Sequence, residues 1–240
     1  MSKISVISLG GSLIIPPSGF KVQFLQDFKK LIVGLIKNGP SFASPAGGAS
    51  PGTRFIIVCG GGATARQYQA AARAVGQLTA DDVDWLGIHA TRLNAHLMRA
   101  IFREWAHPVI VKDPTAKRVW REPVLIASGW RPGCSTDYDA VLLARQYGAR
   151  EIFNLSNIDY VYDSDPRKNP AAKKFTNLTW TEFRKMFGGK WDPGANTPFD
   201  PVAARQAQKL NLTVHILNGV KLTEVRHALL GKKFKGTTII

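Results

Sequence analysis

The sequence is poor in cysteine and in long apolar segments. Its 240 residues include two cysteines, Cys59 and Cys134, which are too few and too far apart to predict a disulfide framework or a metal site. Apolar runs are short and interrupted, so no membrane-spanning segment is predicted. The chain starts directly with the strand-like ISVISL, without the basic, apolar and cleavage regions of a signal peptide. We therefore expect a cytoplasmic protein with no membrane partner.

Acidic residues are also scarce. Only 17 acidic residues oppose 32 lysines and arginines, and the formal net charge is +15. This excess favours anionic partners, either nucleic acids or phosphorylated metabolites, although a basic surface without a specific partner has the same composition. The basic residues form small clusters such as Lys232-Lys233-Lys235, with no basic tail and no nucleic-acid-binding module. Nucleic acid is therefore not expected as a partner, and the composition leaves the high charge unexplained.

Apolar runs that favour strands alternate with amphipathic helical patterns along the chain. Phe24, Phe28, Leu31 and Leu35 recur at the spacing of one helix face, and a longer helix is predicted after the cap-like Thr79. The apolar stripe of that longer helix is predicted at Val83, Leu86, Ala90, Leu93, Leu97 and Ile101. Strands are predicted at Ile4–Leu9, Phe55–Cys59, Val109–Val111, Val124–Ala127, Glu151–Leu155 and Leu212–Leu217. This alternation predicts an α/β fold in which helices cover both faces of a mostly parallel sheet, a three-layer αβα sandwich.

One segment does not fit this alternation. Residues Asn38–Arg54 are rich in Gly, Pro and Ser, and they are predicted to form a mobile surface loop between the first long helix and the second strand. No comparable linker divides the rest of the chain, so a single domain over residues 1–240 is expected.

Three glycine-rich turns carry the chemistry. They are Gly10-Gly11-Ser12, Gly60-Gly61-Gly62 before the helix that contains Arg66, and the stretch Ser128–Asp137. In a parallel sheet, turns that follow strands meet at one edge, where helix N-termini present free N–H groups and glycine admits an anion close to the backbone. Together the three turns predict a phosphate-binding site.

Two other phosphate motifs fit poorly. Gly60, Gly62 and Ala65 match the dinucleotide fingerprint G-x-G-x-x-A, but the acids Asp81 and Asp82 open a helix instead of ending the next strand. A nicotinamide-dependent oxidoreductase is therefore disfavoured. No P-loop pattern G-x-x-x-x-G-K-[ST] is present. The stretch Leu155–Phe175 offers polar and aromatic side chains after a strand, although its composition also suits a solvated loop.

Six motifs then occur in order along the chain: GGS, GGGATARQY, DWLGIHATRLNAHL, RPGCSTD, SNIDYVYDSDP and FDPVAARQAQ. Together they closely resemble the amino acid kinase superfamily and, within it, the uridylate (UMP) kinases of the archaeal type. The resemblance covers the chain except Asn38–Arg54. It implies the amino acid kinase fold, with an acceptor-binding half over about residues 1–128 and a nucleotide-binding half over about 129–240. It also implies transfer of the γ-phosphoryl group of ATP to UMP with Mg²⁺, by a homo-oligomer that is commonly a hexamer.

The resemblance also implies roles for individual residues. UMP would be bound by Gly61, Asp84, Trp130, Arg131, Pro132, Gly133, Cys134, Ser135 and Thr136. ATP would be bound by Gly11, Ser12, Gly62, Arg66, Ser156, Asn157, Tyr162 and Asp165. Arg66 would reach the phosphates at the junction of the two nucleotides, and Asp137 would orient its loop; both are the catalytic candidates, and no residue is assigned to a metal. Taken singly, Thr136 and Asp84 are equally typical of helix caps and Tyr162 of a packing aromatic residue.

Two residues depart from the family pattern. Many relatives have a lysine two positions before the first glycine, where this chain has Ser8, and a glycine at the position of Tyr160, which bears on the ATP loop. Two alternatives to a UMP kinase therefore stay open. One is a related phosphotransferase such as isopentenyl phosphate kinase, which expects a histidine where this chain has Gly61-Gly62-Ala63. The other is a UMP-binding regulatory protein that has lost catalysis.

Overall fold

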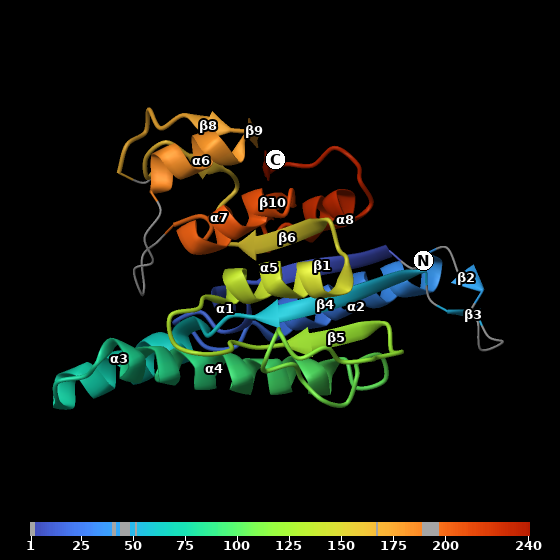
Figure 1. Cartoon of the computed structure of the whole chain (residues 1–240), viewed down its shortest axis with the longest axis horizontal. Helices are drawn as coiled ribbons and strands as arrows, with labels where there is room; N and C mark the ends of the chain where they lie inside the picture. Colours follow the sequence, from blue (N-terminus) through green and yellow to red (C-terminus); the bar gives the residue numbers. More distant parts are fainter. Residues whose placement is uncertain (1–2, 40–41, 44–48, 51, 167, 189–196) are drawn as a thin grey trace.

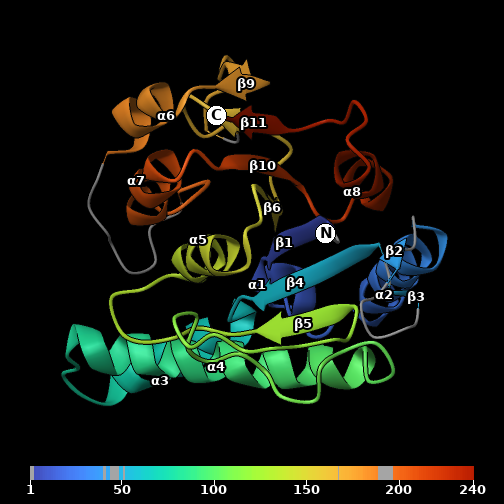
Figure 2. The ribbon, with the colours of Figure 1, turned by 45° about the vertical axis from the view of Figure 1, so that its right-hand side comes forward.

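The computed structural model describes residues 3–39, 42–43, 49–50, 52–166, 168–188 and 197–240. Within these residues a sheet of seven strands forms the middle layer (Figures 1 and 2). In spatial order the strands are β5 (Val124–Ala127), β4 (Thr53–Cys59), β1 (Lys3–Leu9), β6 (Glu151–Ser156), β10 (Thr213–Asn218), β11 (Thr237–Ile239) and β9 (Asn177–Leu178). All neighbouring pairs are parallel except β10 and β11. The predicted mostly parallel sheet is confirmed.

Helices cover both faces of this sheet. The helices are α1 (Gly11–Ile14), α2 (Val22–Asn38), α3 (Gly62–Val75), α4 (Ala80–Ile101), α5 (Thr136–Tyr147), α6 (Trp180–Phe187), α7 (Pro201–Lys209) and α8 (Leu222–Leu229). One apolar core joins the sheet to α5, α6 and α7, and a second joins the opposite face to α1, α2, α4 and α8. Helix α3 lies along α4 (Figure 2). None of the described helices has a stretch both long and apolar enough to span a bilayer.

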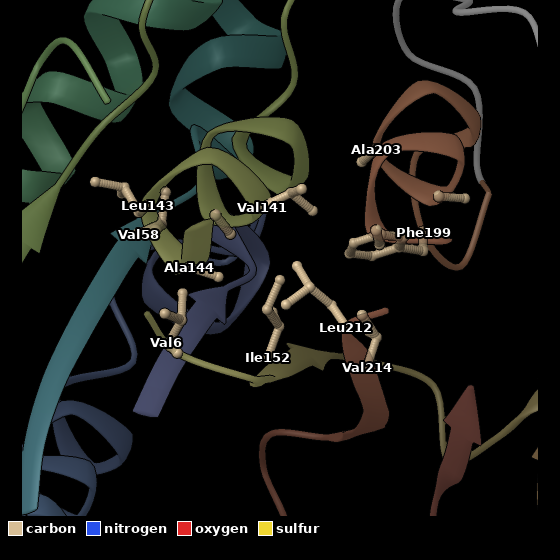
Figure 3. Packing of buried hydrophobic residues seen from close by; sticks show 14 of the residues in the cluster. Val6, Val58, Val141, Leu143, Ala144, Ile152, Phe199, Ala203, Leu212 and Val214 are labelled. Atoms are coloured by element: carbon tan, nitrogen blue, oxygen red, sulfur yellow. The ribbon is translucent and has the colours of Figure 1, made fainter. Parts of the chain in front are cut away.

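The strand side chains alternate between the two cores. On β1, Val6 packs toward α5 whereas Ile7 and Leu9 pack toward the opposite layer. Figure 3 shows Val6 and Ile152 pointing from the sheet toward Val141 and Ala144 of α5. The same alternation directs Ser8 and Asn154 toward α5, because each follows its apolar neighbour by two residues. Two polar side chains therefore reach the N-terminal end of α5.

The strand prediction at Val109–Val111 is wrong. Val111 makes only an isolated parallel bridge with Ala127. Pro108 and Pro114 flank this short stretch, and proline removes the backbone donor that a ladder needs. Two of its three apolar side chains are nevertheless buried, since Ile110 and Val111 are only 3% and 4% exposed, whereas Val109 is 47% exposed.

The predicted loop Asn38–Arg54 contains two short antiparallel strands, β2 (Phe42–Ala43) and β3 (Ala49–Ser50). Its residues 40–41, 44–48 and 51 lie outside the described part of the chain, so the predicted mobility is not tested. A further pair of short strands, β7 (Val161–Tyr162) and β8 (Lys174–Phe175), projects from the segment after β6.

The long helix α4 begins where predicted, but its buried stripe differs. Thr79 is the N-cap, and it forms a capping box with Asp82. Leu93 is 64% exposed, whereas the polar Thr91 and Asn94 are buried. The apolar spacing failed as a guide because these two polar side chains find hydrogen-bond partners in the interior. Those partners belong to the glycine turns, which makes α4 part of the site.

Candidate active site

The carboxyl ends of the parallel strands bring the predicted turns to one edge of the sheet. Gly10 follows β1, Gly60 follows β4 and Ser128 follows β5, and Ser156 and Asn218 end β6 and β10. Because these five strands run in one direction, all five positions lie along the same edge.

The first two glycine turns are in direct backbone contact. The Gly60 N–H donates to the Leu9 carbonyl at 2.9 Å, and the Gly10 N–H donates to the Leu155 carbonyl at 2.8 Å. A Cβ atom on Gly11 would lie 2.6 Å from the Cα of Gly62, a distance at which one backbone must move. Gly62 itself has φ +65°, in the left-handed region that favours glycine. Only glycine at these positions lets the two turns lie together as a bare backbone surface.

Arg66 connects the two turns. It lies in the second turn of α3 and is exposed. Its guanidinium Nη2 donates to Ser12 Oγ at 3.4 Å, a long hydrogen bond across the opening between the turns. Two residues assigned to ATP therefore meet, and Arg66 keeps further N–H donors for an anion.

A cleft of about 650 Å³ lies beside these turns, within the size range of small-molecule sites. Seven residues assigned by the resemblance line it: Gly61, Gly62, Arg66, Asp84, Cys134, Ser135 and Thr136. Gln69, Arg73, Gly87, Thr91 and Gly129 line it as well and were not among the predicted residues. The predicted Trp130, Arg131, Pro132 and Gly133 do not line the cleft; they form the outer part of the same loop. A larger cleft of about 730 Å³ between α2 and α8 contains none of the predicted residues.

Helix α4 holds the loop that forms one wall of the cleft. The Gly133 N–H donates to Asp84 Oδ2 at 2.8 Å, and the Gly129 N–H donates to Thr91 Oγ1 at 2.8 Å. Arg92 Nη2 donates to the Trp130 carbonyl at 3.1 Å. Asp84, assigned to ribose, thus also closes the loop over the cleft.

Asn94 ties the same helix to the second glycine turn. Its Nδ2 donates to the carbonyls of Gly60 and Gly61 at 2.8 and 3.1 Å. Thr91, Arg92 and Asn94 were missed as site residues, although all three belong to the quoted motif TRLNA. The sequence indicated their role only in that they are polar residues within a helix that has an apolar stripe.

The third turn ends at the N-terminus of α5. Ser135 is the N-cap, and its Oγ accepts the Tyr138 N–H at 3.1 Å. Thr136 is the first helical residue and not the cap that the alternative interpretation allowed. The first N–H groups of a helix have no intrahelical acceptor, so this end of α5 suits an anion in the cleft.

Asp137 receives three hydrogen bonds and is partly buried. Ser8 Oγ donates to its Oδ1 at 2.9 Å, and Asn154 Nδ2 donates to the same oxygen at 3.1 Å. The backbone N–H of Asp200, the N-cap of α7, donates to Oδ2 at 3.2 Å. Burial, followed by the nearby Asp200 carboxylate, raises the pKa of Asp137 to about 6, while the bond from Ser8 opposes that rise. Asp137 thus joins β1, β6, α5 and α7 beneath the turns.

Asp139 was not predicted as a site residue. Its side chain is 0% exposed, and Oδ2 accepts the Trp130 N–H at 3.2 Å. Burial raises the pKa of Asp139 to about 8, with further contributions from Asp137, Asp113 and Asp200. The carboxyl group therefore carries its proton at neutral pH.

This proton predicts a pH-dependent stability. Between the ordinary pKa of 3.8 and the folded-state pKa of about 8, the native protein holds a proton that the unfolded chain has released. The contribution to the free energy of unfolding therefore falls as pH rises, by about 1.4 kcal/mol per pH unit in this window. Urea unfolding at pH 5, 6.5 and 8 measures it. We expect D139N to lose less stability than wild type over this range; equal slopes would contradict the buried, protonated Asp139.

The donor-side residues follow β6. Ser156 ends the strand, Asn157 is exposed, and Tyr162 lies in β7. The Asp165 carbonyl accepts the N–H groups of Lys168 and Asn169 and so forms a turn. Ser156 and Asn157 lie beside the first glycine turn, because the Gly10 N–H donates to the carbonyl of the preceding Leu155.

Tyr160 adopts no left-handed backbone, since Asn211 alone among the described non-glycine residues has a positive φ. A bulky side chain therefore causes no backbone strain there. The Lys174 Nζ lies 5.1 Å from the Tyr160 ring centroid, and the Tyr162 ring packs edge-on at 6.4 Å. The bearing of Tyr160 on the ATP loop stays a prediction.

Asp159, in the segment after β6, is bound by one cationic and one polar side chain. Lys221 Nζ lies 2.8 Å from Asp159 Oδ1, and Asn218 Nδ2 donates to the same oxygen at 3.0 Å. These contacts lower the pKa of Asp159, with the Lys221 hydrogen bond as the largest cause. The loop after β6 is thereby tied to the loop after β10.

Comparison with known proteins gives one family for most of the chain. The model of the amino acid kinase family matches residues 3–218. A uridylate kinase of Pyrococcus abyssi is 33% identical over 239 residues, which cover 98% of both chains. A uridylate kinase of Methanospirillum hungatei is 32% identical over 239 residues, or 98% of this chain and 93% of that protein.

Solved structures agree in fold. The crystal structure of uridylate kinase from Archaeoglobus fulgidus superposes with a TM-score of 0.76 at 27% identity, covering 98% of this chain and 99% of that chain. UMP kinase from Bacillus anthracis gives a TM-score of 0.74 at 21% identity, covering 99% and 95%.

Proposed function

The chain belongs to the amino acid kinase family, and we propose that within this family it is a uridylate kinase, which transfers the γ-phosphoryl group of ATP to UMP. The observation that carries the proposal is the meeting of three glycine-rich turns beside a cleft of about 650 Å³ with Arg66 between them. The fold is the amino acid kinase sandwich, and the products are UDP and ADP.

The cleft is proposed as the acceptor site. The phosphate of UMP would lie at the N-terminus of α5, where Ser135, Thr136 and the neighbouring backbone N–H groups donate to it. Asp84 would accept from the ribose hydroxyls with the oxygen that does not hold Gly133. Trp130 to Gly133 contribute as the outer part of the loop. The resemblance further proposes an acceptor half up to about residue 128 and a nucleotide half beyond it, with Trp130–Thr136 of the second half reaching the acceptor and Gly11, Ser12 and Gly62 of the first half reaching ATP.

ATP is proposed to lie across the first glycine turn. Backbone N–H groups at Gly11, Ser12 and Gly62 would hold its phosphates, because glycine lets the anion approach the backbone. Ser156, Asn157, Tyr162 and Asp165 would hold the adenosine part at the end of β6.

Phosphoryl transfer between these sites depends on positioning and charge neutralisation. Arg66 would contact the phosphates where the two nucleotides meet, with a permanent charge and a planar set of donors. The acceptor phosphate is already ionised, so no general base is needed. Asp137 would hold its loop in position, since its carboxylate oxygens already accept hydrogen bonds from Ser8, Asn154 and Asp200.

A divalent metal, proposed to be Mg²⁺, would enter with ATP as part of the substrate. The described residues contain no cluster of three or more His, Cys, Asp or Glu side chains arranged to hold a metal. Mg²⁺ typically binds phosphate oxygens and waters in kinase sites, and it neutralises phosphate charge when bound.

Two further proposals concern the cellular location and the oligomeric state. A cytoplasmic location follows from the nucleotides that the enzyme would use. A homo-oligomer, with the hexamer as the expected form, would bury the exposed apolar side chains Phe20 and Leu93 on and near α2 and α4.

The acceptor is tested with a panel of phosphates. ADP release in the presence of Mg-ATP should be fastest with UMP and at least tenfold slower with CMP, GMP and isopentenyl phosphate. Faster turnover of isopentenyl phosphate would assign the chain to another phosphotransferase. UMP binding without turnover would instead support a regulatory protein.

A further inference from the structure

The peptide unit of Trp130 is held from both sides. Its N–H donates to Asp139 Oδ2 at 3.2 Å, and its carbonyl accepts from Arg92 Nη2 at 3.1 Å. The neighbouring Gly129 N–H is bound to Thr91. Residue 130 is thereby attached to α5 on one side and to α4 on the other. Helix α4 lines the cleft together with α3, and α5 reaches it with its first residue, Thr136.

Asp139 is an unusual choice for this attachment. Its side chain is fully buried, and its second oxygen Oδ1 has no hydrogen-bond partner among the described residues. An ionised carboxylate in that position would be a buried charge with one hydrogen bond, whereas a protonated carboxyl group costs far less to bury.

The charged and titratable groups around Asp139 mostly share its sign. Asp137 lies on the same helix, Asp200 precedes α7, and Asp113 lies in the segment after Val111. Cys134 lies in the loop itself. Burial raises the pKa of its thiol, and the nearby Asp139 adds to that rise. The two arginines that contact Trp130 bind other groups: Arg92 of α4 donates to the Trp130 carbonyl, and Arg131 of the loop stacks on the Trp130 ring with its Cζ 4.1 Å from the centroid.

We propose that Asp139 is a positioning residue of the acceptor site that acts as a neutral carboxylic acid, fixing the Trp130 peptide while adding no negative charge to the helix end that receives the acceptor phosphate. The inference rests on the proposed function, because it concerns the phosphate site of the nucleotide acceptor. Asp139 lies in the first turns of α5, three residues after Thr136. An ionised Asp139 would repel a phosphate dianion at this end and weaken the helix dipole that attracts it.

The proposal predicts that UMP binding weakens at alkaline pH; this part of the pH profile is called the alkaline limb below. As pH rises through the pKa of about 8, Asp139 ionises and the Michaelis constant for UMP should rise about tenfold between pH 7 and 9.5. The Michaelis constant for ATP should change much less, since Asp139 does not contact the first glycine turn.

Two substitutions separate the hydrogen bond from the charge. D139N keeps an oxygen that can accept the Trp130 N–H but cannot ionise, so its Michaelis constant for UMP should stay near the wild-type value at pH 7 and lose the alkaline limb. D139L removes the acceptor, so it should raise the constant about tenfold at every pH. Asp27, a partly exposed carboxylate on α2, gives the control: D27N should keep the wild-type profile.

The experiment measures initial rates with UMP and Mg-ATP from pH 6 to 9.5, and UMP binding by calorimetry at pH 7 and 9. Ionisation of UMP itself affects wild type and D139N alike, so the difference between their profiles isolates Asp139. An alkaline limb that persists in D139N overturns the proposal, as does an unchanged UMP constant in folded D139L. Wild-type protein that neither binds nor turns over UMP would instead overturn the proposed function. Should D139L fail to fold, the D139N comparison alone decides.

Discussion

R66A should lose nearly all turnover of UMP while the protein remains folded. Arg66 is exposed, and within the described part of the chain its side chain makes one hydrogen bond, the 3.4 Å contact to Ser12 Oγ, so truncating it should leave the fold intact. In the complex its guanidinium would stabilise charge that develops as the phosphoryl group passes between nucleotides. Removing one preorganised donor of this kind typically lowers kcat by about a hundred- to a thousandfold. The expected result is a loss in that range, measured by coupled ADP release with saturating Mg-ATP and UMP.

The controls for R66A test charge and geometry. R66K keeps the charge but loses the planar pair of donors, so it should recover only part of the activity. R226A, an exposed arginine on α8 away from the turns, should behave as wild type in activity and thermal midpoint. An R66A protein with more than a tenth of wild-type turnover would contradict the role of Arg66.

G11A should lose both stability and ATP binding. The added Cβ would lie 2.6 Å from Gly62 Cα and 2.7 Å from the Gly60 carbonyl carbon, and all of these atoms belong to backbone. Backbone cannot rotate away as a flexible side chain can, so the two glycine turns must separate. Overpacking of this kind costs about 3 kcal/mol of unfolding free energy or more. Because the turns would also form the phosphate surface, the Michaelis constant for ATP should rise at least tenfold in whatever protein folds.

G34A is the matched control for G11A. Gly34 lies inside α2, and a Cβ there meets no atom within 4 Å. Replacing a helical glycine by alanine should raise the unfolding free energy by about 0.5–1 kcal/mol, with unchanged kinetics. Urea unfolding and ATP-dependent rates check both variants. Wild-type stability and ATP affinity in G11A would mean that the close approach of the two turns is not required.

The layout of the fold follows from local patterns. Apolar runs with helices between them predicted a mostly parallel sheet, and the predicted strand at Val124–Ala127 matches β5. The cap-like Thr79 predicted the start of α4, and in the structure it forms a capping box with Asp82, three residues on. The prediction failed at Val109–Val111, where Ile110 and Val111 are buried without joining a ladder.

The candidate site, too, was only partly predicted from the sequence. Glycine turns can be recognised in sequence because they depend on local backbone geometry, and their meeting follows from parallel strands. Thr91 accepts a hydrogen bond from the turns, and Arg92 and Asn94 donate to them. These bonds span more than thirty residues of chain, so the helix motif alone did not reveal them. The resemblance supplied residue roles, and the structure supplied the contacts by which those residues are held.

By itself the sequence determined the α/β class, the positions of the glycine turns and their common edge, because these depend on short-range periodicity and on residues without a side chain. Only the tertiary structure decided the protonation of Asp139 and the surroundings of Asp137. Ser8, Asn154 and Asp200 reach Asp137 from three separate elements, and Asp139 is fully buried among further carboxyl groups. A pKa depends on burial and on charges brought together in space, and no local pattern of residues encodes either.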